Sequence, residues 1–141
     1  MADSPTILID INILLDVLQQ REPFFGASAR LLAMVEAGHI KGYIAAHSVT
    51  TLFYLIQKDR SSAQARASIT SLLQFLAIAP VDHNTIEQAL NLDYSDFEDA
   101  VQMISALQCK AEFLITRNVA DYQPALLPVM QPVDFLGTIE F

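Results

Sequence analysis

Carboxylates occur at three separated places in this sequence where a strand ends or a helix begins. Asp10 closes the apolar run TILID, Asp96 and Asp99 precede the apolar run AVQMISAL, and Asp121 follows the run EFLIT. If these places meet, their negative charges repel one another, and the group is costly unless a cation binds it. Oxygen ligands with room for water suit Mg²⁺ or Mn²⁺. The pattern therefore predicts that Asp10, Asp96, Asp99 and Asp121 form a site for a divalent metal.

Other chemistries lack the residues that they need. The three His and one Cys show no spacing suited to zinc, and there is no Gly-rich phosphate loop and no nucleophilic Ser or Cys motif. The single Cys109 excludes an internal disulfide, which suits the cytoplasm. A net charge of -8 argues against broad electrostatic capture of nucleic acid, although a bound metal can reverse the sign of the charge at one point.

Helix capping is a simpler interpretation of the acids that precede AVQMISAL. Ser95 and Glu98 fit a capping box, and acids in a first turn complement the helix dipole. Taken alone, that stretch favours capping over metal binding. Asp10 favours the metal site, because a carboxylate that ends a buried strand is not needed to cap a helix that Asn12 already begins.

Three further polar residues have weaker or divided interpretations. Arg117 either contacts a substrate phosphate or forms an ion pair with a neighbouring acid. Ser48 is expected to cap a helix, with a lesser possibility that it supports the site beside Asp10. Asp16 is expected to be a solvated charge on a helix. The three histidines are expected at the surface or its boundary, and the aromatic side chains in the core or in a dimer contact.

The elements that must position the acids alternate between strand and helix. Short apolar runs predict strands at residues 6–10, 42–46, 78–82, 112–116 and 126–130. Apolar periodicity predicts helices at residues 12–20, 28–37, 47–58, 61–76, 83–92 and 100–109. This alternation predicts a three-layer α/β/α sandwich with a mostly parallel, roughly five-stranded sheet, in which ligands bind beyond the carboxyl ends of the strands.

The length of the chain predicts one domain over residues 1–141. No apolar run approaches the roughly 20 residues that a bilayer crossing needs. The N-terminal stretch MADSPTILID also lacks the basic region and cleavage site of a signal peptide. We therefore expect no membrane attachment and a cytoplasmic location.

Three segments together resemble a known family. LIDINILLDVL, DFEDAVQMISAL and FLITRNVADY are similar, in order and spacing, to the acidic motifs of PIN domains, particularly the bacterial toxin ribonucleases of VapC type. The resemblance runs from about Thr6 to Phe135. It implies a homodimer and an acidic pocket that binds Mg²⁺ or Mn²⁺ and cuts single-stranded RNA.

Carried over by position, the resemblance implies metal ligands at Asp10, Asp99 and Asp121, and an additional catalytic acid at Asp96. Asn12 and Asn118 match polar residues that support the site. One feature departs from the family pattern. Such nucleases carry another acid, a Glu on the helix after the second strand, whereas HSVTTLFYLIQK has none.

The leading hypothesis is therefore metal-assisted hydrolysis of RNA by the toxin of a toxin–antitoxin pair. The resemblance also implies an antitoxin protein whose basic segment blocks the acidic groove. The alternative is a catalytically weakened PIN-like module that binds RNA or a basic protein segment without cleavage, which the absent Glu and the net negative charge favour. A phospho-acceptor receiver domain would need a Lys where this chain has TRN.

Overall fold

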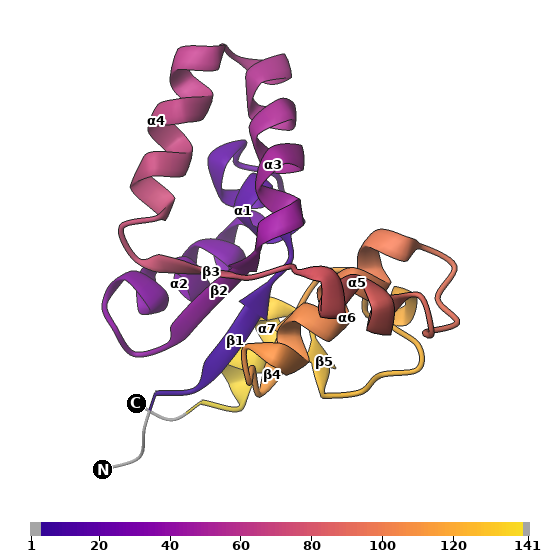
Figure 1. The fold of residues 1–141 in the computed structure, drawn as a ribbon. Coiled ribbons are helices and arrows are strands. Elements are labelled where there is room, and N and C mark those ends of the chain that lie inside the picture. The colour runs from indigo at the N-terminus through magenta and orange to yellow at the C-terminus, as the bar shows by residue number, and fades with distance from the viewer. Residues whose placement is uncertain (1–3, 140–141) are drawn as a thin grey trace.

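A computed structural model describes residues 4–139 and shows a parallel sheet between two layers of helices (Figure 1). The elements in chain order are β1 (Thr6–Ile9), α1 (Ile11–Leu18), α2 (Phe25–Glu36), β2 (Lys41–Ala45), α3 (Ala46–Asp59), α4 (Ser62–Leu72), β3 (Leu76–Ala79), α5 (His83–Ala89), α6 (Phe97–Gln108), β4 (Phe113–Ile115), the 3₁₀ helix η1 (Val119–Asp121), β5 (Val129–Met130) and α7 (Pro132–Gly137). The predicted three-layer α/β/α fold with a parallel five-stranded sheet is confirmed.

The order of the strands is β3-β2-β1-β4-β5, and every neighbouring pair is parallel. The chain moves outward from β1 to β3 on one side and then returns to place β4 against the other side of β1. The strand order therefore reverses between β1 and β4. In open α/β sheets this switch point, beyond the carboxyl ends of the strands, is where ligands bind.

Successive residues of β1 point to opposite faces of the sheet, as the pleat of a strand requires. Ile7 and Ile9 pack in the larger core with α1, α2, α3, α4 and α7, whereas Leu8 packs with α6 in the smaller core on the other face. All three side chains are fully buried. β1 is thus the central, doubly covered strand that its continuous apolar run predicts.

Several predicted element boundaries were wrong, and one helix was missed. The helix expected to reach Leu76 ends at Leu72, because Leu76 pairs with Gly42 and begins β3. β3 then ends before Pro80 and lies at the sheet edge, as a strand near a proline should. α7 was not predicted, although Pro132 occupies its first turn, a position that favours proline.

The predicted N-caps were also wrong. Asn12 and Ser48 lie inside their helices, α1 begins directly after Asp10, and α3 begins directly after Ala45. The cap of α6 is Asp96 and not Ser95, since Oδ1 of Asp96 accepts a hydrogen bond from the Glu98 N–H at 2.9 Å. Within residues 4–139, none of the helices has the length and apolar character that a membrane crossing requires.

Candidate active site: an acidic pocket at the carboxyl ends of the strands

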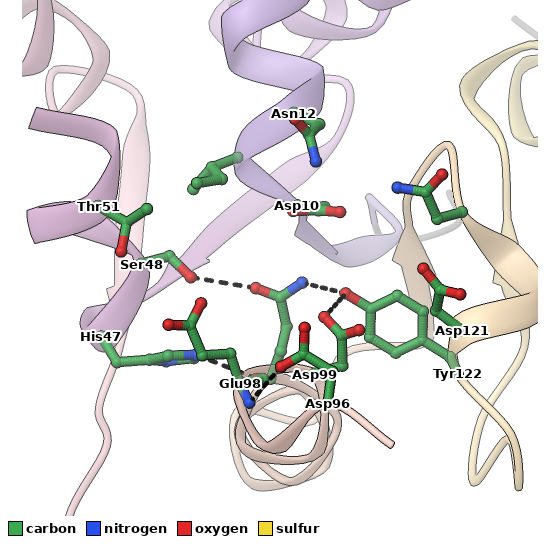
Figure 2. Close-up of a pocket in the computed structure, with 13 residues that line it drawn as sticks. Asp10, Asn12, His47, Ser48, Thr51, Asp96, Glu98, Asp99, Asp121 and Tyr122 are labelled. Carbon is green, nitrogen blue, oxygen red and sulfur yellow. Dashed lines mark hydrogen bonds between the residues drawn. The ribbon is translucent and has the colours of Figure 1, made fainter. Parts of the chain in front are cut away.

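A cavity of about 200 Å³ lies beyond the carboxyl ends of β1, β2 and β4. Figure 2 shows Asp10 and Asn12 on one side of it, Asp96, Glu98 and Asp99 opposite them on α6, and Asp121 with Tyr122 near η1. We call this cavity the acidic pocket. The structure brings together in its lining all seven residues singled out from the sequence, namely Asp10, Asn12, Ser48, Asp96, Asp99, Asn118 and Asp121.

Asp10 is held at the junction between β1 and α1, which follow each other without a loop. Its backbone N–H donates to the Ile115 carbonyl at 3.0 Å, and its Oδ2 accepts a hydrogen bond from Thr116 Oγ1 at 2.8 Å. The side chain of Asp10 makes no cap hydrogen bond to α1, although Asp10 occupies the N-cap position. Its carboxylate is therefore oriented by Thr116, which directly follows β4 across the switch point.

Thr116 also orders the segment that carries the last acid. Its Oγ1 accepts a hydrogen bond from the Asn118 N–H at 3.1 Å, which begins the turn into η1. Sequence reasoning missed Thr116, which is fully buried. The available signal was its position, because Thr116 directly follows β4 as Asp10 directly follows β1.

Asp99 is held by a buried chain of hydrogen bonds that crosses the pocket. Ser48 Oγ donates to Gln102 Oε1 at 3.2 Å, Gln102 Nε2 donates to Tyr122 Oη at 2.7 Å, and Tyr122 Oη donates to Asp99 Oδ1 at 3.2 Å. An ionised carboxylate can only accept, so the phenolic proton faces Asp99 and the direction of every other bond in the chain follows. We call Ser48, Gln102 and Tyr122 the relay. Gln102 and Tyr122 are 3% and 1% exposed and were not identified from the sequence.

The electrostatics of the pocket show that its acids act on one another. Burial and the charge of Asp96 raise the pKa of Asp99 to about 6, with smaller contributions from Asp10 and Asp121, while the hydrogen bond from Tyr122 opposes the rise. Burial and the charges of Asp10 and Asp99 raise the pKa of Tyr122 above its ordinary value, so its hydroxyl stays protonated and donates. Asp96 and Asp121 are exposed at the mouth of the pocket.

Helix α3 contributes only neutral side chains to the acidic pocket. His47, Ser48 and Thr51 line it, so none of them is the Glu that the resemblance in sequence implied for this helix. His47 is half-buried, its Nε2 lies 3.2 Å from the Glu98 carbonyl oxygen, and burial lowers its pKa. The departure noted in the sequence is therefore also a departure in the lining of the pocket.

The donor set of the pocket fits a hard divalent ion that keeps water ligands. The described residues that line the pocket include no Lys or Arg to neutralise the acids. Thr116 and Tyr122 each engage one carboxylate oxygen, which leaves the other oxygen of Asp10 and of Asp99 for a ligand. Between residues 4 and 139, no three His, Cys, Asp or Glu side chains form a ready-made metal cage. Mg²⁺ does not need one, because it usually binds through one or two carboxylates, waters and substrate phosphate.

Arg117 lies outside the acidic pocket and forms the ion pair that was one of its two interpretations. Its Nε is 3.2 Å from Oδ2 of Asp16, whose side chain is 0% exposed. The prediction that Asp16 is solvated was therefore wrong. Burial raises the pKa of Asp16, and the positive charges of Arg117 and Arg21 oppose that rise.

Comparison with known families gives one match over most of the chain. A family model described as PIN domain matches residues 6–120. A comparison with curated proteins finds no match.

Solved structures share the fold at low sequence identity. A toxin-antitoxin complex from Klebsiella pneumoniae has a TM-score of 0.68 at 23% identity, covering 89% of this chain and 97% of that one. FitAcB from Neisseria gonorrhoeae has a TM-score of 0.68 at 19% identity, with 90% and 98% covered. VapC20 of Mycobacterium tuberculosis, described as a sarcin-ricin loop cleaving toxin, has a TM-score of 0.62 at 16% identity, with 77% and 86% covered. At these identities the likeness establishes the fold.

Proposed function

Because the chain belongs to the PIN domain family, we propose that it is a metal-dependent endoribonuclease that cuts single-stranded RNA, acting as the toxin of a toxin–antitoxin pair. One observation carries the proposal. Asp10, Asp96, Asp99 and Asp121 come from three distant parts of the chain and line one pocket at the switch point of the sheet. Such a cluster serves catalysis more readily than stability, since unpaired like charges oppose folding.

The residues that would hold Mg²⁺ or Mn²⁺ are Asp10, Asp99 and Asp121. A bound ion of this kind supplies charge neutralisation at the phosphodiester and acidifies water at neutral pH. Thr116 and the relay orient the carboxylates of Asp10 and Asp99 in advance. Asp121 or Asp96 would orient the attacking water and accept its proton. Asp121 is the better placed of the two, because one oxygen of Asp96 already caps α6.

The proposed partner is an antitoxin protein with a basic segment. The Klebsiella relative in fold is described as a toxin-antitoxin complex. An uncompensated acidic pocket would attract and hold Lys or Arg side chains, which would exclude both metal and RNA. Co-purification with the product of an adjacent open reading frame tests this part of the proposal. A homodimer, a single domain over residues 1–141 and a cytoplasmic location are also part of it.

One observation favours the alternative of a module that binds without cleaving. Among the described residues that line the acidic pocket, those from α3 include no acid. In that case the acidic pocket would bind a basic protein segment, or the domain would bind RNA and leave it intact. The two functions differ in one measurable property, which is metal-dependent scission of RNA.

The deciding experiment is cleavage of a mixed single-stranded RNA pool with Mg²⁺, Mn²⁺ or EDTA, beside the Asp99→Asn variant purified in the same way. We expect cleavage that needs metal and that disappears in the variant. Asn has nearly the same size as Asp and keeps one oxygen that can accept a hydrogen bond from Tyr122. If folded, partner-free wild-type protein cuts nothing under any condition, the binding module becomes the better description. Full activity of Asp99→Asn would show instead that the site is assigned to the wrong residues.

A further inference from the structure

A second cavity, of about 310 Å³, lies on the same edge of the sheet as the acidic pocket. Gln131, which lines it, directly follows β5, and Arg117 comes after Thr116 at the end of β4, so the cavity stands at the carboxyl ends of these two strands. Asn118, the next residue after Arg117, already lines the acidic pocket. The two cavities are therefore neighbours along one edge, joined by consecutive residues of a single loop.

A stacked pair of side chains, Phe24 and Arg117, lines the second cavity. The guanidinium carbon of Arg117 lies 4.1 Å from the ring centroid of Phe24, whose side chain is 37% exposed although it is large and apolar. The guanidinium of Arg117 also forms the ion pair with the buried Asp16, at 3.2 Å from Nε to Oδ2. Pro23, Pro132 and Val133 supply the other walls. The stacked pair is thus held in place before any ligand arrives.

We propose that this cavity binds one unpaired base of the RNA substrate, stacked on the outside of the Phe24–Arg117 pair, next to the nucleotide whose phosphate enters the acidic pocket. The proposal rests on the proposed function, since it names a subsite for the same RNA. Proteins read single-stranded RNA by stacking its bases on aromatic rings and on Arg guanidinium planes.

Charge favours RNA over a basic protein segment as the occupant. Arg117 is the one charged residue among the described residues that line the second cavity, and it is paired with the buried Asp16. The described lining thus offers no carboxylate to a Lys or Arg side chain, unlike the acidic pocket beside it. A guanidinium in the wall favours a strand that carries phosphates over a basic peptide.

The test measures the effect of changing Phe24 on intact RNA and on RNAs that each lack one base. A short RNA that the protein cuts is made with an abasic nucleotide at each successive position around the cut. Phe24→Leu keeps apolar bulk and removes the aromatic face, Phe24→Tyr restores that face, and Tyr54→Leu removes an exposed aromatic ring outside both cavities. Melting temperatures of all variants are compared with that of the wild type.

We expect Phe24→Leu to raise the KM for intact RNA about tenfold with little change in kcat, because loss of ground-state stacking weakens substrate and transition state alike. Phe24→Tyr and Tyr54→Leu should behave as the wild type. At one abasic position the penalty of Phe24→Leu should disappear, which identifies the bound nucleotide.

Three results would overturn the subsite while leaving the nuclease intact. These are an unchanged KM in Phe24→Leu, an equal penalty on intact RNA and on every abasic RNA, and an effect confined to the binding of a co-purified protein. The last would make the cavity part of a protein interface. Absence of cleavage by the wild type would instead reject the proposed function, and the subsite with it.

Discussion

The phenolic hydroxyl of Tyr122 donates a hydrogen bond to Oδ1 of Asp99 over 3.2 Å. The two residues lie on different elements, since Asp99 is in the first turn of α6 and Tyr122 follows η1. Behind Tyr122, Gln102 and Ser48 extend the chain of bonds to α3. The relay therefore makes the orientation of one acid depend on three helices at once.

Removal of that hydroxyl should impair the acidic pocket more than the fold. In Tyr122→Phe, Asp99 loses a donor and Gln102 loses its acceptor, and a hydrogen bond to a charged group is worth about 1.5–3 kcal/mol. We expect RNA cleavage to fall by roughly ten- to a hundredfold. Tyr94→Phe is the matched control, because Tyr94 packs edge-on against Tyr122 but its hydroxyl donates to the Pro124 carbonyl. Equal losses in both variants would show that packing, and not the relay, matters.

A divalent metal should stabilise the folded protein by ordinary binding linkage. At about a hundredfold excess of Mn²⁺ over its Kd, the gain is about 2.7 kcal/mol, or roughly 10 °C in melting temperature. Asp10→Asn should raise the melting temperature in EDTA, because it removes one repelling charge, and should lose most of the response to Mn²⁺. Asp134→Asn, an exposed acid on α7 outside the pocket, should respond as the wild type does. Identical melting with Mn²⁺ and with EDTA would contradict metal binding.

The pH dependence of the metal-free protein should reveal the raised pKa of Asp99. Its folded-state value of about 6 exceeds the ordinary 3.8, so the folded protein holds this proton more tightly than the unfolded chain. The stability that this group contributes is complete below about pH 4 and is lost as the pH rises through about 6. In EDTA, the melting temperature of Asp99→Asn minus that of the wild type should therefore increase as the pH rises from about 4 to about 6. A constant difference across that range would argue against the shift.

The neutral face of α3 offers a gain-of-function test. Thr51 lines the acidic pocket from α3, the helix on which the resemblance in sequence implied a Glu. Thr51→Glu should strengthen Mn²⁺ binding several-fold, since affinity rises with the number of charged ligands, and should lower the metal concentration needed for cleavage. Thr50→Glu adds the same charge at an exposed neighbouring position and is the control. Equal effects from both would mean that only net charge changed.

The buried ion pair between Asp16 and Arg117 should behave asymmetrically when it is broken. Arg117→Met leaves the fully buried carboxylate of Asp16 without its main partner, at a cost of about 3–5 kcal/mol in the free energy of unfolding. Asp16→Asn should cost less, because Arg117 is partly exposed and still contacts Phe24. The double variant should recover part of the Arg117→Met loss. Urea denaturation measures all three, and strict additivity would show that the pair does not interact.

The sequence predicted the layers of the fold and the convergence of the acids because both follow from local signals. β1 reads as a doubly buried strand from its apolar run alone, and Asp10 is placed by the end of that run. Once the strands are parallel, their carboxyl ends must share an edge, so acids at those ends meet. The catalytic and metal-binding roles of these acids stay predictions.

The supporting contacts could not be predicted because their partners are distant in sequence. Thr116 and Asp10 are 106 residues apart, and Tyr122 and Asp99 are 23 apart, so neither pairing has a local signature. Asp16 reads as a surface charge on its own helix, and its ion-pair partner Arg117 is far away in the sequence. The helix end predicted at Leu76 was wrong for a similar reason. The helical pattern of the sequence continues past Leu72, but pairing with β2 places Leu76 in a strand.

The acids of the pocket are held to different degrees, because Asp10 lies at the direct junction of β1 and α1 whereas Asp121 lies in the short helix η1. Asp10 sits between the last residue of a buried strand and the first of a helix, so its backbone entropy is already lost when the domain folds. Asp121 ends a short 3₁₀ helix and is exposed, so its side chain has more freedom than the buried side chain of Asp10. Differences in ionic radius between Mg²⁺ and Mn²⁺ would then be absorbed on the Asp121 side, which makes that side the place to alter metal preference without disturbing the sheet.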